Sequence, residues 1–133
     1  MATIRKEVLI EAPPSQVWDA LRDFFEVHTR LVPGFVTACE REGPAVRKVT
    51  FFNGMTAKEQ LVTCDDAAQR LVYTVVGGRA THYNASVHVF PEGAGGTRLV
   101  WIIDLLPDEL AAPIGAMMDR GAAAMARQLR PGT

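Results

Sequence analysis

The chain has 133 residues, of which 48% are hydrophobic, and its formal net charge is −1. This length is typical of one domain with a sizeable core, so we expect residues 1–133 to form a single domain. No run of lysine and arginine is present, which argues against a nucleic-acid partner. No stretch approaches the ~20 apolar residues of a membrane span, and the N-terminus lacks the apolar run of a signal peptide.

The two cysteines, Cys39 and Cys64, have neither metal-site nor CxxC spacing. Free thiols in a reducing cytoplasm are the simpler interpretation, with a single disulfide as the alternative. His82 and His88 lie too far apart on one predicted strand to chelate a metal together, and no nucleotide-binding glycine pattern occurs. We therefore expect no metal and no cofactor.

The N-terminal segment TIRKEVLIEA alternates, with Ile4, Val8 and Ile10 on one side, and this predicts a strand with one buried face. The following segment, PPSQVWDALRDFFEVHTRLVPG, begins with prolines that suit a helix start. Its apolar residues have helical spacing, which predicts two short helices with a break near Asp23.

From Phe35 onward the chain alternates between strand patterns and turn chemistry. Sequential strands joined by short turns predict an antiparallel meander. The expected strands cover residues 35–42, 46–52, 55–64, 70–76, 82–90 and 97–105.

The last segment, PDELAAPIGAMMDRGAAAMARQLRPG, has an apolar stripe with helical spacing and predicts one long helix with Asp108 as its N-cap. Gly121 within it costs ~1 kcal/mol relative to alanine. Close packing against the sheet or space for a ligand would each explain that glycine. The chain is therefore predicted to be α+β: a curved antiparallel seven-stranded sheet wrapped around a long C-terminal helix, with an interior pocket.

The element IEAPPSQVWDAL, followed by a meander and a C-terminal amphipathic helix, resembles the START-like (SRPBCC) superfamily with its helix-grip fold. That superfamily includes polyketide cyclase/dehydrase-like and pollen-allergen-like proteins. The pattern RKVTFFNG…EQLVTCDDAAQRLVYTVVGG…HYNASVHV is most similar to the branch of the plant abscisic-acid receptors. Those receptors bind a small apolar acid between sheet and helix, so the resemblance implies a ligand cavity in the same place.

The resemblance also implies which residues line such a cavity. Glu59 matches a cavity carboxylate, Tyr83 a cavity tyrosine, and the remaining matches are apolar wall positions or the helix face that closes the pocket. The implied ligand-binding set is Glu59, Tyr83, Val49, Phe51, Tyr73, Val75, Met117, Met118 and Gly121, to which the small side chain of Ala85 beside Tyr83 adds expected space.

This sequence departs from the receptor pattern in three places. The mobile gate loop is shortened to Asn53-Gly54, and no His-Arg-Leu latch follows Gly77-Gly78. The pocket lysine that pairs with the hormone's carboxylate is replaced near Thr37. The resemblance therefore does not imply a hormone receptor.

The turn at Asn53-Gly54 decides which face Glu59 occupies. A two-residue turn would set Lys48 opposite Glu59, and the carboxylate would lie at the surface. A three-residue loop, 52–54, places Val49 and Phe51 on the face of Glu59, and we favour it because register follows the buried face. An inward Glu59 is then either a satisfied buried carboxylate, paired with Arg47, or a polar anchor in a solvated cavity.

Three functions compete. The first is binding of a small, largely hydrophobic molecule in the internal cavity, and the second is a cyclase, dehydratase or isomerase with Glu59 and Tyr83 as an acid/base pair. The third is a homodimer through the outer sheet face, which carries Val62, Phe90 and Val100.

Two further residues of the last predicted strand are placed by its alternation. Trp101 is expected in the core, and the strand phase of Asp104 argues against a second cavity carboxylate.

Overall fold

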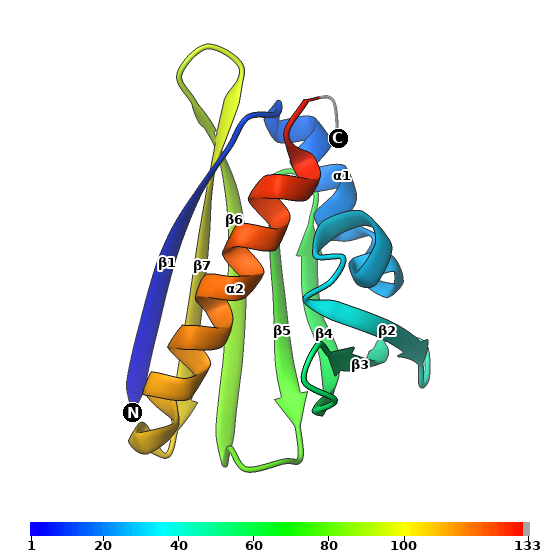
Figure 1. Cartoon of the computed structure of the whole chain (residues 1–133), viewed down its shortest axis with the longest axis vertical. Helices are drawn as coiled ribbons and strands as arrows, with labels where there is room; N and C mark the ends of the chain where they lie inside the picture. Colours follow the sequence, from blue (N-terminus) through cyan, green and yellow to red (C-terminus); the bar gives the residue numbers. More distant parts are fainter. Residues whose placement is uncertain (132–133) are drawn as a thin grey trace.

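The computed structural model describes residues 1–131 and consists of one antiparallel sheet wrapped around a long C-terminal helix (Figure 1). The seven strands are β1 (Ala2–Ile10), β2 (Val36–Arg41), β3 (Val46–Phe51), β4 (Thr56–Asp65), β5 (Arg70–Val76), β6 (His82–Glu92) and β7 (Gly96–Leu106), in the sheet order β1-β7-β6-β5-β4-β3-β2. The predicted α+β class and helix-grip architecture are confirmed.

The segment between β1 and β2 packs beside the sheet in three pieces. Helix α1 (Pro14–Arg22) begins with the expected proline, buries Val17, Trp18 and Leu21, and ends at Asp23 as predicted. A 3-10 turn, η1 (Phe24–Glu26), and a π-helical turn, η2 (Val27–Leu31), follow it. Two consecutive changes of helical winding are not readable from apolar spacing here, because segments of 3 and 5 residues are too short to distinguish the periods of the three helix types.

Helix α2 (Ala111–Leu129) crosses the concave face of the sheet, as Figure 1 shows, and packs mainly against β1. A 3-10 turn, η3 (Asp108–Leu110), precedes it. Asp108 is therefore not the N-cap of the long helix, and that prediction is wrong. The extra turn moves the start of α2 to residue 111. The carboxylate of Asp108 instead lies 3.1 Å from the N-terminal amine of Met1.

The turn between β3 and β4 has the predicted three-residue form. Gly54 has φ of +85°, Gly54 N–H donates to the Phe51 carbonyl, and Phe51 N–H donates to the Met55 carbonyl. In the resulting ladder Val49 pairs with Ala57, and Arg47 with Glu59. The favoured register is thus the observed one, and it turns Glu59 toward the interior.

A bulge in β4 ends this alternation. Leu61 pairs with Tyr73 and Thr63 with Val72, so Val62 has no partner on β5 and lies outward. A bulge bends its strand and increases the local twist.

Gly121 of α2 packs against two aromatic rings. A Cβ at this position would lie 3.1 Å from Phe35 Cε2 and 3.1 Å from Trp101 Cζ3. We expect Gly121→Leu to lower the free energy of unfolding by at least about 1 kcal/mol, because overpacking outweighs the gain in helix propensity. Ala123→Leu, on the exposed face of the same helix, should change it by less than about 0.5 kcal/mol. Urea denaturation of both variants checks this, and equal midpoints would contradict close packing at Gly121.

Candidate functional site

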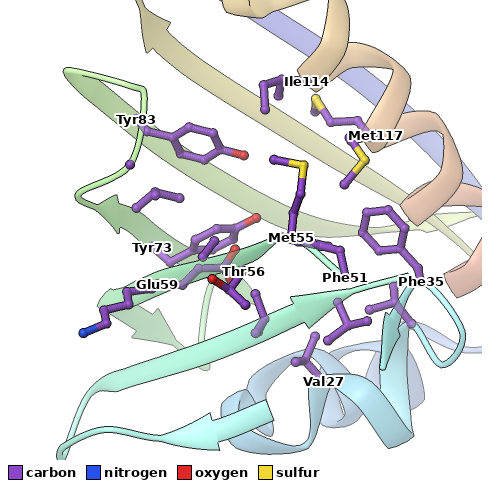
Figure 2. A pocket seen from close by; sticks show the side chains of 18 of the residues that line it. Val27, Phe35, Phe51, Met55, Thr56, Glu59, Tyr73, Tyr83, Ile114 and Met117 are labelled. Carbon is purple, nitrogen blue, oxygen red and sulfur yellow. The ribbon is translucent and has the colours of Figure 1, made fainter. Parts of the chain in front are cut away.

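A cavity with a volume of about 1060 Å³ lies between the concave face of the sheet and α2 (Figure 2). Its mouth is bounded by the β3–β4 turn, the loop 77–80 between β5 and β6, and the first turns of α2. Exposed lining residues at this end, such as Met55 and Val76, mark the opening. The sheet curves away from the helix here, and the side chains between them leave the space open.

The wall of the cavity is mostly apolar and comes from every layer of the molecule. Val27 and Leu31 of η2 and Phe35 close one side, Ile114 and Met117 of α2 close another, and strands β3 to β7 form the floor. Figure 2 shows Ile114 and Met117 facing Phe51 and Phe35 across the space. A mostly apolar wall with few polar groups is typical of small-molecule sites.

Glu59 lies in this wall and is paired with Arg47. Arg47 Nε and Nη2 each lie 2.8 Å from Glu59 Oε1, and the two side chains are each 8% exposed. Arg47 Nη1 donates to the Phe24 carbonyl oxygen at 2.7 Å, and its Cζ lies 3.9 Å from the centroid of the Phe24 ring. The pair therefore joins β3, β4 and η1 and places a fixed, balanced charge in the cavity wall.

Tyr73 and Tyr83 add two hydroxyl groups to the same wall, and Figure 2 shows both pointing toward the middle of the cavity. Burial raises the pKa of Tyr73, the charge of Glu59 adds to the rise, and Arg47 and Trp101 oppose it. Burial likewise raises the pKa of Tyr83, to which Tyr73 and Glu59 contribute. Both hydroxyls therefore stay protonated and can donate hydrogen bonds.

The structure brings most of the predicted site residues together around this cavity. The lining contains Glu59, Tyr83, Val49, Phe51, Tyr73, Val75, Met117 and Met118. It contains neither Ala85, which is 0% exposed, nor Gly121, which packs against Phe35 and Trp101. For these two positions the expectation of ligand space is corrected, because neighbouring side chains cover both. The roles of the other eight in binding stay predictions.

Several lining residues did not stand out in the sequence as site candidates. They include Val27 and Leu31, Phe35, Ile114, and Trp101, which the strand pattern had assigned to the core. The four-residue spacing of Val27 and Leu31 carries a signal for one apolar face, but it does not say that the face borders a cavity. Asp104 lies outside the lining, as its strand phase predicted, and accepts a hydrogen bond from Thr3 Oγ1 at 2.6 Å.

The two tyrosines of the chain make a direct test of this geometry, because no other tyrosine contributes to its ultraviolet spectrum. Unfolded tyrosine ionises near pH 10, and both native pKa values are raised. A raised native pKa means that the folded state holds the proton more tightly, so the stabilisation is complete below about pH 10 and is lost as pH rises further. We expect no phenolate absorbance until the protein unfolds in alkali. Ionisation of either tyrosine near pH 10 in the folded state would contradict its burial.

The fold defines a class of protein in which a curved antiparallel sheet wraps around a long C-terminal helix, and solved structures share this fold. The protein XoxI from Bacillus cereus has a similar structure, with a TM-score of 0.86 at 20% identity, covering 97% of this chain and 96% of that one. A solution structure from Thermobifida fusca has a TM-score of 0.74 at 28% identity, covering 98% and 97%. A norcoclaurine synthase variant from Thalictrum, in complex with a transition-state analogue, has a TM-score of 0.71 at 18% identity, covering 96% and 93%.

The sequence profile of the family "Polyketide cyclase / dehydrase and lipid transport" matches residues 1–130, and the chain belongs to this family. A START superfamily protein from Mycobacterium smegmatis is also similar in structure, with a TM-score of 0.77 at 12% identity over 96% of each chain. No curated protein matches the sequence. The START-like, helix-grip assignment is thereby confirmed. Over residues 1–131, no helix is both long and apolar enough to cross a membrane.

Proposed function

We propose that this protein binds a small, largely hydrophobic molecule in the cavity between the sheet and α2. The observation that carries the proposal is a cavity of about 1060 Å³ with an apolar wall and one buried charge pair. A volume of this size is enough for a drug-sized ligand. The family, whose description includes lipid transport, supports the same function.

Native mass spectrometry of the protein purified from its own host tests this proposal. A ligand bound in the cavity adds a discrete mass to the folded protein, and denaturation removes it. A second measurement uses an uncharged fluorescent probe, N-phenyl-1-naphthylamine, whose emission rises in an apolar site. A folded protein with neither an added mass nor probe binding would overturn the proposal.

A second candidate function is catalysis of the cyclase, dehydratase or isomerase type in the same cavity. It is favoured by the presence of both Glu59 and Tyr83 in the wall of one cavity. Glu59 would be the general base and Tyr83 the donor to a developing oxyanion. Glu59→Gln separates the two functions, because binding survives the exchange while general-base catalysis falls by about 10²–10⁴-fold. We rank binding first because Arg47 already holds one oxygen of Glu59.

We further infer a cytoplasmic protein with reduced thiols and without a nucleic-acid partner. Cys39 and Cys64 are both free, which agrees with that setting. The homodimer remains a prediction for the outer sheet face, where Val62 is 56% exposed but Val100 is only 6% exposed. Light scattering at two concentrations tests it, and an unchanging monomer mass would exclude it.

A further inference from the structure

Several polar atoms that line the cavity make no hydrogen bond to another residue within 1–131. Among them are Oε2 of Glu59, the hydroxyl oxygens of Tyr73 and Tyr83, and the buried indole nitrogen of Trp101. Oε1 of Glu59 takes both bonds from Arg47, so Oε2 is left for the cavity. Glu59 and Tyr73 are each 6% exposed, and buried polar groups of this kind need a partner.

The cation beside Glu59 is already fully engaged. The guanidinium of Arg47 bonds Glu59 through two of its nitrogens and the Phe24 carbonyl through the third, and its face covers the Phe24 ring. The other cationic lining residues are Lys48, Lys58, Arg79 and Arg120, and of these only Lys48 is even partly buried. An anion placed beside Glu59 would therefore meet the charge of that carboxylate without a free cation to balance its own.

The two tyrosine hydroxyl groups complete the polar part of the wall around Glu59. Each stays neutral and can donate one hydrogen bond and accept another. The buried indole nitrogen of Trp101, close to Tyr73, has no acceptor in hydrogen-bond geometry in the described chain. Together the wall offers an anionic acceptor in Glu59 and neutral donors in the tyrosines.

We propose that the part of the cavity lined by Glu59, Tyr73 and Tyr83 takes the hydroxyl group of an uncharged alcohol or phenol and excludes the carboxylate of a matching acid. The ligand hydroxyl donates to Glu59 Oε2 and accepts from Tyr73 or Tyr83, while its apolar body lies against the aromatic and methionine side chains of the wall. This inference rests on the proposed binding function and adds the chemical class of the ligand and its orientation.

The test compares three ligands of one shape on the unmodified protein at neutral pH. Each of 2-naphthol, 2-naphthoate and 2-methoxynaphthalene competes against N-phenyl-1-naphthylamine. We expect 2-naphthol to displace the probe at least about tenfold more effectively than 2-naphthoate, because the acid buries an unbalanced charge. We expect the affinity for 2-naphthol to exceed the affinity for 2-methoxynaphthalene by about fivefold, because the ether cannot donate a hydrogen bond to Glu59. Equal affinity for naphthol and either competitor overturns the inference.

For the variant Glu59→Gln we expect the opposite change in the preference between 2-naphthol and 2-naphthoate. This variant removes the negative charge and leaves Arg47 unbalanced, so the affinity for 2-naphthoate should rise and the preference for 2-naphthol should narrow or invert. An unchanged preference in folded Glu59→Gln protein would overturn the role of Glu59. Tyr73→Phe keeps the Arg47–Glu59 pair and should weaken the binding of 2-naphthol about fivefold. If both Tyr73→Phe and Tyr83→Phe bind 2-naphthol as tightly as the unmodified protein does, the inference is overturned.

The failures of the two proposals are distinguishable in this assay. If N-phenyl-1-naphthylamine does not bind the unmodified protein, the proposed function fails and the ligand class fails with it. If the probe binds and the three competitors displace it equally, the cavity binds ligands without the proposed selectivity. The second result overturns only the ligand class.

Discussion

Replacing Arg47 with methionine is expected to lower the free energy of unfolding by about 3–5 kcal/mol. The change removes the partner of a carboxylate that is 8% exposed, and Glu59 is then buried beside an apolar wall with its charge unbalanced. It also removes the donor to the Phe24 carbonyl. Equilibrium denaturation in urea, followed by tryptophan fluorescence, measures the loss.

Two further variants make this result specific to the buried pair. Lys58→Met breaks an exposed ion pair with Glu42, and we expect a change below about 1 kcal/mol. The double variant Arg47→Met/Glu59→Met removes both charges and should recover most of the stability, since apolar replacements of buried pairs are often neutral or stabilising. A double variant as unstable as Arg47→Met alone would show that the charge of Glu59 is not the cause.

The expected recovery of the double variant bears on why the pair is present. If two methionines support the fold as well as Arg47 and Glu59 do, stability does not explain a buried ion pair in the wall of a cavity. The free oxygen of Glu59 then has its use in ligand recognition, and Arg47 acts as the residue that holds it in position. Measuring both the free energy of unfolding and the ligand selectivity of Arg47→Met and of the double variant separates a role of the pair in stability from a role in ligand recognition.

The register of the β3–β4 hairpin shows how far the sequence could predict this site. Only the three-residue loop puts the apolar residues Val49 and Phe51 of β3 on the same face as Ala57 of β4, and that constraint also turned Glu59 and Arg47 inward. The pairing of these two residues followed from the same register. Elements with one clearly buried face were therefore predictable to within one or two residues, because a shift of one residue would expose the whole face.

The limits of that prediction lie where packing between elements decides. The small size of Ala85 suggested space beside Tyr83, but neighbouring side chains bury it fully. Gly121 fits two rings that come from β7 and from the loop before β2. The short windings η1 and η2, which carry Phe24 and Val27 to the site, depend on the same long-range contacts. Strand and helix periodicity report which face is buried, but not which buried face is left unfilled.

Filling the cavity from within is the change with the largest expected effect on binding. Ala57 lies on the inner face of β4, opposite Val49, and lines the cavity. Ala57→Trp should place an indole in the space that a ligand would occupy and abolish binding of N-phenyl-1-naphthylamine, with a loss of at least about 100-fold. The fold should survive, because the added side chain enters open volume rather than a packed core.

Ala85 provides the matched control for this experiment. It is an inward alanine of the same sheet, but it is 0% exposed and lies outside the cavity lining. Enlarging it to leucine should cost about 1–3 kcal/mol of stability, since its neighbours must move to admit the side chain. Thermal denaturation and probe titration on both variants therefore give opposite patterns: Ala57→Trp loses binding and stays folded, whereas Ala85→Leu loses stability and, while folded, still binds. Probe affinity unchanged in Ala57→Trp would place the ligand elsewhere on the protein and leave the cavity without a function.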